Sequence, residues 1–423
     1  MVHTSPVIAP LQRENAVVSL LSLPTEIIGH VLGQLGASDL NSLTRTCHRL
    51  HKLAEDDLLW ARLARDNLPN APESPWPSFT WKSLYTSHHP YWFLPKHKIW
   101  FSDHVHTGKL ILVKYDPRRG SIEGCRLLCS KGETNFEDWS YRPSVTTHSF
   151  QPRVTLHRDR PVLKMNHPSA PGYTERRGSL KGEFRMRVGA DRHDSIYSSL
   201  FLSRAIPKPL QDPSMELWPP SNISAPERVR NASQDRFQGW GHKPHKDEEI
   251  CQSIFRLRTW MQFSSGGPAF GVRMGEEVST WSTLDPAVYA PTKEKPFQGI
   301  YVGDYGPHNC EFILVTQTDT IPELPDPEWS TDGLPHNDSE PISEGVPDDP
   351  IYKGRLEAIK LTGDLNVPRG EYTWFANDIG PAGSIRIAEE EPFRGARIVR
   401  SQGQLADPGF QDSKQKSIPA DLT

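Results

Sequence analysis

Residues 20–60 read LLSLPTEIIGHVLGQLGASDLNSLTRTCHRLHKLAEDDLLW and form the most strongly periodic stretch of the chain. Apolar side chains recur in it at the spacing of a helix face. The first helix is expected to carry Ile27, Ile28, Val31, Leu32 and Leu35, the second Leu40, Leu43, Cys47 and Leu50, and the third Leu58, Leu59 and Trp60. Three helices this short enclose little core, so they need a partner or the rest of the chain for stability.

Local signals mark where these helices begin and end. Pro24 fixes φ and is well tolerated in the first turn of a helix. Gly36 is expected to end the first helix, and Ser38 or Asp39 can cap the second. The third helix is expected to begin at about Asp56.

The same stretch resembles the F-box. The residues that carry the resemblance are Leu23, Pro24, Glu26, Ile27, Ile28, Val31, Leu32, Leu35, Asp39, Leu40, Leu43, Cys47, Leu50, Leu53, Leu59 and Trp60. An F-box docks on the Skp adaptor, which joins it to a cullin-RING ubiquitin ligase. The resemblance implies that the adaptor is contacted by Leu23, Pro24, Glu26, Ile27, Ile28, Val31, Leu32, Leu35, Leu40, Leu43, Leu50 and Trp60. The alternative is an ordinary helical hairpin that caps the next domain.

Composition sets further bounds. A chain of 423 residues suggests two or three domains, and its 39 prolines are nearly twice the usual share of about 5%. The net charge of −4 gives no reason to expect nucleic acid or an anionic membrane as the main partner. The five cysteines are scattered without a CxxC spacing, which fits a reducing cytosol or nucleus. We find no signal peptide and no apolar run long enough to span a bilayer.

Changes in composition along the chain predict its domain organisation. The predicted parts are a flexible leader at 1–19, the F-box at 20–67, a linker with a short helix at 68–89, a β-barrel-like domain at 90–410 and a disordered tail at 411–423. Two long insertions are expected inside the β-domain, at about 166–250 and 317–350, because both are rich in proline and poor in apolar residues. The second insertion is also strongly acidic.

The region after residue 90 is typical of short antiparallel strands joined by turns. The predicted strands lie at 109–115, 121–129, 154–156, 162–165, 254–263, 300–302 and 310–316, with two further strand pairs within 355–376 and 384–406. Strands without intervening helices favour an antiparallel barrel or sandwich. The predicted fold class is therefore α+β, with a small N-terminal three-helix F-box followed by a mainly antiparallel β-barrel-like domain.

Two turns in this region are similar to those of the F-box protein family that recognises cyclin D in animals. One runs from Gly299 to Cys310, and the other contains Lys360, Thr362, Gly363, Asp364, Asn366, Pro368 and Gly370. The chain as a whole resembles fungal F-box proteins that carry this C-terminal region. The resemblance implies that the β-domain binds a protein substrate for ubiquitylation.

These turns have two possible roles. Glycines at 303, 306 and 363 permit positive φ, so both motifs can be structural turns of a barrel. Alternatively they form the rim of a recognition cleft, since aromatic side chains often anchor interfaces. The residues of such a cleft would be Tyr301, Tyr305, His308, Lys360, Thr362 and Asp364.

We find no constellation that indicates catalysis: the chain has no GxSxG elbow and no Walker A sequence. If His104 and His106 lie on one strand face they can ligate a metal, but no carboxylate motif accompanies them, and surface histidines are the alternative. A basic patch of Arg153, His157, Arg158 and Arg160 is either a solvated face or a reader of an acidic or phosphorylated degron.

The sequence thus predicts a non-catalytic adaptor without a cofactor, in the cytoplasm, the nucleus or both. Its expected role is the substrate-recognition subunit of an SCF (Skp-cullin-F-box) E3 ubiquitin ligase. Two alternatives stay open: a barrel that binds a small ligand, and an F-box scaffold that works outside ubiquitylation.

Overall fold

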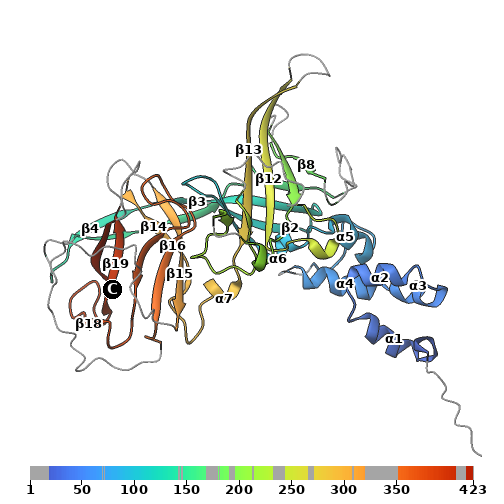
Figure 1. Ribbon diagram of the computed structural model, residues 1–423, viewed down its shortest axis with the longest axis horizontal. Coiled ribbons are helices and arrows are strands. Elements are labelled where there is room, and N and C mark those ends of the chain that lie inside the picture. Colours follow the sequence, from blue (N-terminus) through green and yellow to red (C-terminus); the bar gives the residue numbers. More distant parts are fainter. Residues whose placement is uncertain are drawn as a thin grey trace, which may run out of the picture. The chain divides into compact units, whose positions relative to one another are not determined.

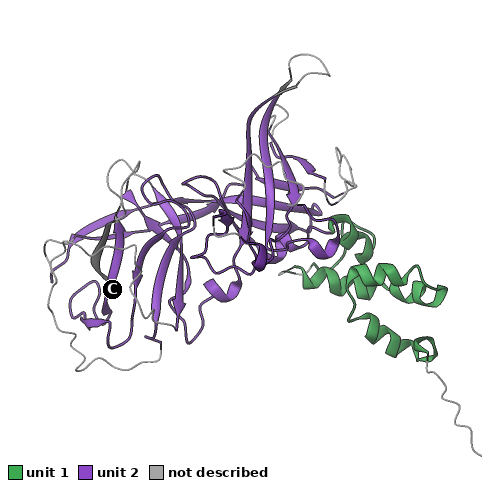
Figure 2. Ribbon diagram, in the orientation of Figure 1, with its two compact units in different colours: residues 1–89 green, residues 90–423 purple. Residues whose placement is uncertain are grey.

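The computed structural model describes residues 19–68, 70, 72–141, 143, 146–167, 180, 182–189, 196–211, 214–231, 243–264, 271–306, 309–319, 351–405 and 416–422. The chain divides into two compact units, residues 1–89 and residues 90–423, which Figure 2 shows in green and purple. The predicted leader at 1–19 lies, except for its last residue, outside the described residues.

The first unit consists of short helices (Figure 1). They are η1 (Leu20–Ser22), α1 (Thr25–Leu32), α2 (Ala37–Leu43), α3 (His48–Ala54), α4 (Asp57–Asp66) and α5 (Trp81–His88). Within this described helical region, none of the helices is long and apolar enough to cross a membrane, and the same holds for those of the second unit.

One predicted helix is in fact two. The chain leaves the helix after Leu43 and resumes it at His48, with Cys47 extended at φ −151° and ψ 160°. The hydroxyls of Thr44 and Thr46 donate to the carbonyls of Asn41 and Leu43 at 2.7 and 2.8 Å, which competes with continuation of the helix. The predicted cap is also corrected, because Gly36 is the N-cap of α2 and its extended backbone needs no capping side chain.

The core of the helical unit is built on Trp60. Its ring is 1% exposed, its Nε1 donates to the Ala54 carbonyl at 2.9 Å, and it lies 5.7 Å from the ring of Tyr85 on α5. Ile28 of α1 and Leu40 of α2 are fully buried. Each of the helices α1–α5 thus contributes buried apolar side chains, whereas η1 has none, and the isolated helices could not form such a core.

The second unit contains two large antiparallel sheets. The first, of nine strands, runs in the order β6-β3-β2-β1-β13-β12-β9-β8, with β7 paired to β3. Its strands are β1 (Ile99–Ser102), β2 (Leu110–Asp116), β3 (Ser121–Ser130), β6 (Arg153–Leu156), β7 (Leu163–Met165), β8 (Phe184–Arg187), β9 (Ile196–Leu202), β12 (Ile254–Ser264) and β13 (Gly271–Thr283). This sheet curls, because β7 near one end lies against β8 at the other.

The second sheet, of seven strands, runs in the order β14-β15-β16-β17-β19-β18, with β20 paired to β19. Its strands are β14 (Gly299–Asp304), β15 (Cys310–Thr318), β16 (Arg355–Lys360), β17 (Tyr372–Ala376), β18 (Ser384–Ile387), β19 (Arg397–Leu405) and β20 (Lys416–Leu422). The unit is completed by the hairpins β4 (Thr134–Asp138) with β5 (Thr146–Phe150) and β10 (Leu217–Trp218) with β11 (Val229–Arg230), and by α6 (Phe93–His97), α7 (Pro286–Tyr289), η2 (Lys208–Leu210) and η4 (Asp247–Glu249).

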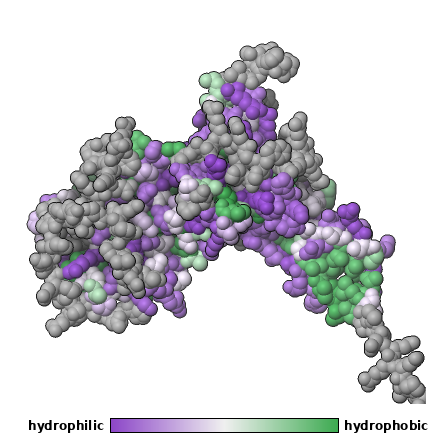
Figure 3. All heavy atoms as spheres, in the orientation of Figure 1, coloured by the Kyte–Doolittle hydropathy of each residue, from purple (hydrophilic) through white to green (hydrophobic). Residues whose placement is uncertain are grey.

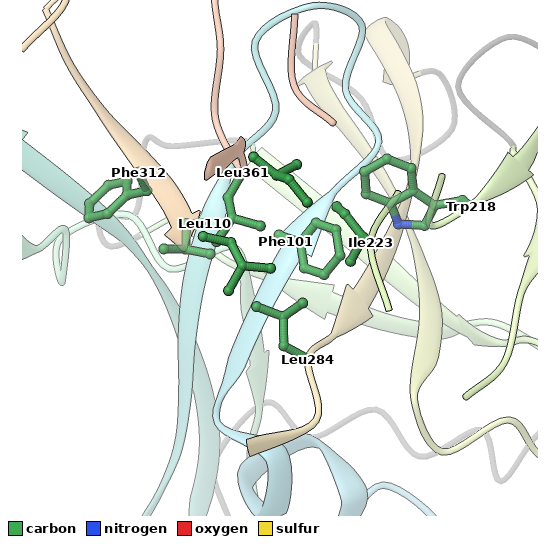
Figure 4. Packing of buried hydrophobic residues seen from close by; sticks show 9 residues of the cluster. Phe101, Leu110, Trp218, Ile223, Leu284, Phe312 and Leu361 are labelled. Carbon is green, nitrogen blue, oxygen red and sulfur yellow. The ribbon is translucent and has the colours of Figure 1, made fainter. Parts of the chain in front are cut away.

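A shared core joins the two sheets. Phe101 and Leu110 of the first sheet pack with Phe312 of the second (Figure 4). Trp218 and Ile223, from the segment between β9 and β12, belong to the same cluster and are 1% and 0% exposed, and its other buried members are Leu284, Leu314, Ile359 and Leu361. Because burial of large apolar side chains is the main stabilising term in folding, the two sheets stabilise each other.

The predicted fold class is confirmed: a small helical region precedes a mainly antiparallel β region that includes a half-barrel sheet. The strands predicted at 154–156 and 162–165 are β6 and β7, and most later predictions match a strand within a few residues. The β region consists of two large sheets, however, where one barrel was expected.

Two predicted irregular segments contain strands. β9 and the core residue Trp218 lie inside the expected insertion at 166–250, and β9 pairs with both β8 and β12. Residues 166–250 were predicted to be irregular because their apolar content is low, and the serines at 198 and 199 and the surrounding prolines contribute to that low value. In the expected disordered tail, the backbone of β20 pairs with β19. Most of the expected acidic insertion, residues 320–350, lies outside the described residues.

Candidate protein-binding sites

The residues predicted to bind the Skp adaptor divide into groups by exposure. The buried group is Ile28, Leu32, Leu40, Leu50 and Trp60. The exposed group is Pro24, Glu26, Ile27 and Val31, while Leu23, Leu35 and Leu43 are half-buried. The buried side chains hold the helices together, so the structure gives them a core role where the resemblance implied contact with a partner.

Four of the seven exposed large apolar side chains described in the helical unit lie within residues 20–31, and the other three are Leu58, Trp76 and Phe79. Ile27 and Val31 stand one turn apart on α1 and are 48% and 43% exposed, and the adjoining Leu20 and Leu21 are 41% and 39% exposed. We call these four side chains the α1 apolar face. Figure 3 shows hydrophobic surface gathered over the helical unit. Clustered exposed apolar side chains of this kind mark sites of protein interaction.

Arg49 of α3 fixes the segment that precedes α1. Its guanidinium donates to the carbonyl of Leu23 at 3.1 Å and also to that of Leu21. The segment before α1 is thereby fixed against α3, which orders the apolar side chains that a partner would meet. Sequence reasoning missed Arg49, because an exposed arginine on a helix gives no local sign of a bond to a carbonyl more than twenty-five residues away.

In the β-domain, the two predicted recognition turns meet at a buried lysine. Lys360, the last residue of β16, is 0% exposed. Its Nζ lies 2.7 Å from Glu311 Oε2 of β15, 3.3 Å from Asp364 Oδ2 in the turn after β16, and 3.8 Å from the centroid of the Tyr305 ring. We call these four residues the Lys360 cluster. Glu311 was not predicted as a site residue, since nothing in its neighbourhood of the sequence marks it.

The charges of the Lys360 cluster balance. Burial raises the pKa of Glu311 to about 8, and the nearby Asp364 carboxyl acts in the same direction. Burial also acts to raise the pKa of Asp364, but the backbone N–H of Val367, the Glu311 carboxyl and the Lys360 charge together lower it. At neutral pH, Glu311 therefore keeps its proton and one carboxylate faces one ammonium. Lys360 and Asp364 are satisfied internally and buried, which corrects their prediction as contacts for a substrate.

The other predicted cleft residues differ in exposure. Thr362 Oγ1 accepts from the Phe312 N–H at 2.9 Å, and the Tyr305 hydroxyl bonds to Thr373 Oγ1 at 2.9 Å, so both are used in holding the sheet together. Tyr301 on β14 is 46% exposed, and its hydroxyl donates to the Phe297 carbonyl at 3.0 Å. His308 lies outside the described residues. Tyr301 is thus the described member of the set that offers surface to a partner.

The second turn motif joins the two sheets. The N–H of Gly363 donates to the Thr107 carbonyl at 2.7 Å, and the Arg369 guanidinium donates to the carbonyls of Asp103 and His104 at 2.8 Å each. Arg369 also stacks 4.5 Å from the Trp218 ring centroid. The turn at residues 361–370 thus has a structural role, although Gly363 lacks the positive φ that the sequence suggested, and Arg369 is a further residue that sequence reasoning missed.

The two histidines considered as metal ligands do not share a strand face. Both follow β1 in a turn, and His106 has a positive φ of 59°. His104 Nδ1 bonds to Ser102 Oγ at 2.6 Å, and its Nε2 lies 3.3 Å from Glu277 Oε1, an interaction that helps lower the pKa of Glu277 to about 2. In the part of the chain that the structure describes, no group of three or more His, Cys, Asp or Glu residues is arranged to hold a metal ion.

The basic patch predicted at residues 153–160 lies on and after the edge strand β6. Arg153, Arg158 and Arg160 are all exposed, and His157 is half-buried. Asp159 stands between two of the arginines in the sequence, so the patch is of mixed charge. These positions fit a solvated face.

One face of the first sheet is filled by packed side chains, which bears on the small-ligand alternative. The strand register and the burial place together Trp100, Val113, Ile122, Leu163, Met165, Leu202, Phe255 and Trp281. The packing is tight: a Cβ on Gly124 would come within 2.7 Å of Leu163 Cγ. In the described strands of this sheet, the space that a ligand would need is occupied by the protein's own side chains.

Comparisons with known proteins match separate parts of the chain. A family model described as F-box-like matches residues 20–66, and one described as Cyclin D1 binding domain matches residues 281–422. The chain is also similar to Protein EXECUTER 2, chloroplastic, of Oryza sativa subsp. japonica, with 29% identity over 121 residues, which are 28% of this chain and 16% of that protein. The corresponding protein of Arabidopsis thaliana is 27% identical over 140 residues, which are 32% of this chain and 19% of that protein.

The chain thus spans less than a fifth of the length of these two relatives. The two family matches fall one in each compact unit. The chain thus carries a helical region at residues 20–66 that matches the F-box-like family model and a β region at residues 281–422 that matches the model described as Cyclin D1 binding domain.

Proposed function

We propose that this protein is the substrate-recognition subunit of an SCF E3 ubiquitin ligase. The F-box binds the Skp adaptor, and the β-domain binds a protein substrate. The observation that carries the proposal is the α1 apolar face, which an F-box-like domain exposes on a small helical unit. The protein itself performs no chemistry in this role, because it acts by holding a substrate close to the ligase. It would work in the cytoplasm, the nucleus or both.

The energetics of the α1 apolar face support a protein partner. Fully burying an isoleucine or valine side chain contributes roughly 1.5–3 kcal/mol. Ile27, Val31, Leu20 and Leu21 are each at least 39% exposed, so they still offer much of that energy. A partner with a complementary apolar groove gains this burial free energy when it binds. Arg49 keeps the α1 apolar face ordered in the free protein, which lowers the entropy cost of association.

For the β-domain, the name of the matching family model makes a cyclin D1-like protein the first candidate substrate. We place the contact near Tyr301, because this tyrosine is exposed on β14, the edge strand of the second sheet. Tyrosines are enriched among the residues that dominate protein interfaces. Tyr301→Ala should therefore weaken substrate capture without unfolding the sheet. Lys353→Ala, an exposed change in the same unit, serves as the matched control.

A substrate trap tests the whole proposal. Cells expressing the full chain or its Ile27→Glu/Val31→Glu variant are compared by proximity labelling, with the proteasome blocked. The proposal predicts that the same proteins are labelled in both kinds of cell. These proteins should carry ubiquitin in cells with the wild type and should not carry it in cells with the variant. Labelled proteins whose ubiquitylation and turnover are the same in both would support the scaffold alternative and contradict the proposal.

A further inference from the structure

Two cysteines that are far apart in the sequence come together where the two sheets of the β-domain approach each other. Cys129 lies near the end of β3 in the first sheet, and Cys310 is the first residue of β15 in the second. β3 and β15 are in contact, and Cys129 packs against the shared core that contains Phe312 and Leu314 of β15. The two cysteine side chains interact with each other, and the Cys129 thiol donates to the Ser130 carbonyl at 3.7 Å.

A second set of contacts fixes the same juxtaposition independently. Lys131, two residues beyond Cys129, places its Nζ 2.6 Å from Asp304 Oδ1 and also donates to the carbonyl of Gly306. Asp304 is the cross-strand partner of Cys310 in the β14–β15 pair. The end of β3 therefore lies beside the Asp304–Cys310 residue pair of the second sheet. This placement follows from the contacts of Lys131 and does not depend on the cysteine side chains.

We propose that Cys129 and Cys310 form a reversible disulfide that covalently joins β3 to β15 when the protein meets a peroxide. Both side chains are half-buried, so a small oxidant can reach them while the strands hold them together. The inference does not depend on the ligase role. Disulfides of reducing compartments are usually transient and redox-sensing, and this pair fits that class.

The chemistry balances with hydrogen peroxide as the oxidant. The Cys310 sulfur attacks one peroxide oxygen, the O–O bond breaks, and a sulfenic acid and water result. The Cys129 sulfur then attacks the sulfenic sulfur, the S–O bond breaks, and a second water leaves as the S–S bond forms. Two thiols and one peroxide thus give one disulfide and two waters. Burial and the neighbouring Cys310 raise the pKa of Cys129 to about 12, so we assign the first attack on the peroxide to Cys310.

The other cysteines lack such a partner geometry. Cys125, on the same strand as Cys129, is 3% exposed, and burial raises its pKa. Cys251 is 1% exposed and donates to Glu227 Oε2 at 2.7 Å. Cys47 belongs to the helical unit. An oxidised Cys129–Cys310 pair would fasten the β14–β15 hairpin, which carries Tyr301 and Tyr305, to the first sheet, so the redox state would set how rigidly this hairpin is held.

Peptide mapping of the oxidised protein tests the proposal. The full-length reduced chain is treated with hydrogen peroxide, alkylated without reduction, digested and analysed by mass spectrometry. The expected product is a cross-linked pair of peptides containing Cys129 and Cys310, lighter by two hydrogens than their sum and separated by dithiothreitol. Cys129→Ser and Cys310→Ser should each abolish it, while Cys125→Ser, on the same strand, should retain it.

Two results would overturn the proposal: oxidation of these thiols to sulfinic acids without a cross-link, or cross-links distributed among all five cysteines. If a serine variant fails to fold, the map of the wild-type protein still decides between these outcomes. A further expectation is that oxidation raises the thermal unfolding midpoint of the wild type, and that dithiothreitol reverses the shift. If oxidised protein that carries the cross-link unfolds at the same midpoint as reduced protein without it, a role in fastening the sheets is contradicted.

Discussion

Lys360 is a buried cation held by a carboxylate, a protonated carboxyl and an aromatic ring. Removing one partner of such a cluster leaves uncompensated charge in the interior, which typically costs about 3–5 kcal/mol. Lys360→Ala should therefore lower the free energy of unfolding by about that amount, measured by denaturant titration. Lys353→Ala, at an exposed position nearby, should change it by less than about 0.5 kcal/mol. Equal effects of the two changes would show that the Lys360 cluster does not stabilise the sheet.

Glu311 predicts a pH dependence of stability with a definite sign. Its folded-state pKa of about 8 lies above the ordinary value of 4.5, so the folded state binds the proton more tightly than the unfolded state. This contribution is fully present below the ordinary pKa and is lost as the pH rises through the folded one. Over that window the wild type should lose stability relative to Glu311→Gln, in unfolding measured at several pH values. A difference that stays constant with pH would contradict the prediction.

The sequence identified the right neighbourhood of this cluster but not its role. Lys360 and Asp364 stood out through a motif, and both were expected to face a substrate, yet the sheet buries them. Glu311 did not stand out, because its partners come from strands that meet it only after folding. Exposure and charge pairing of this kind depend on sheet packing, which no local pattern of residues reports. Tyr301, on the edge strand β14, is the described member of the predicted set that is exposed.

At the scale of single elements, Trp60 of α4 is the side chain on which the helical unit depends. Trp60→Ala removes a fully buried ring and should lower the free energy of unfolding by about 3–5 kcal/mol. Circular dichroism during thermal unfolding of the full chain should show the helical signal lost at lower temperature. Leu58→Ala, on the same helix but 75% exposed, is the matched control and should leave that transition unchanged. Early loss of the helices in the control would contradict the assignment of Trp60 as the core residue.

Elements with strong periodicity were predicted well, and those shaped by competing interactions were not. α4 follows its apolar spacing closely, whereas α1 ends at Leu32, before the predicted Leu35 and the predicted stop at Gly36. The break between α2 and α3 arises from threonine hydroxyls that bond to helix carbonyls, a competition that apolar spacing does not reveal. β13 was not expected, because its outer half is polar and exposed and lacks the apolar alternation that marks a strand. β13 forms because it pairs antiparallel with β12 and β1 on its two sides.

At the scale of the β-domain, Arg369 is a link between the two sheets. It donates two hydrogen bonds to carbonyls of the β1–β2 connection and stacks on Trp218. Hydrogen bonds from charged groups contribute about 1.5–3 kcal/mol, so Arg369→Ala should lower the free energy of unfolding by at least that much. Hydrogen exchange should also speed up in both the 103–108 and the 361–370 turns. Arg394→Ala, an exposed change in the same unit, should do neither; protection lost in one turn alone would contradict a linking role.

The organisation of the whole molecule was predictable in outline. A helical part followed by an antiparallel β part could be inferred from the change in residue pattern near residue 90. The division of the strands into two sheets could not, because it depends on which strands pair across long stretches of chain, as β1 does with β13. The core contribution of Trp218 was not predicted for the same reason, since Pro219, Pro220, Ser221 and Asn222 follow it and the segment resembled an irregular insertion.

Direct titration of the full chain with purified Skp adaptor tests the central claim most closely. By isothermal calorimetry we expect saturable one-to-one binding of the wild type. Charges at two side chains of the α1 apolar face forfeit roughly 1.5–3 kcal/mol each, so Ile27→Glu/Val31→Glu should bind about 100-fold more weakly or worse. Lys52→Glu, an exposed charge change on α3, should bind as the wild type does. Undiminished binding of a folded Ile27→Glu/Val31→Glu variant, or no binding by the wild type, would contradict the account.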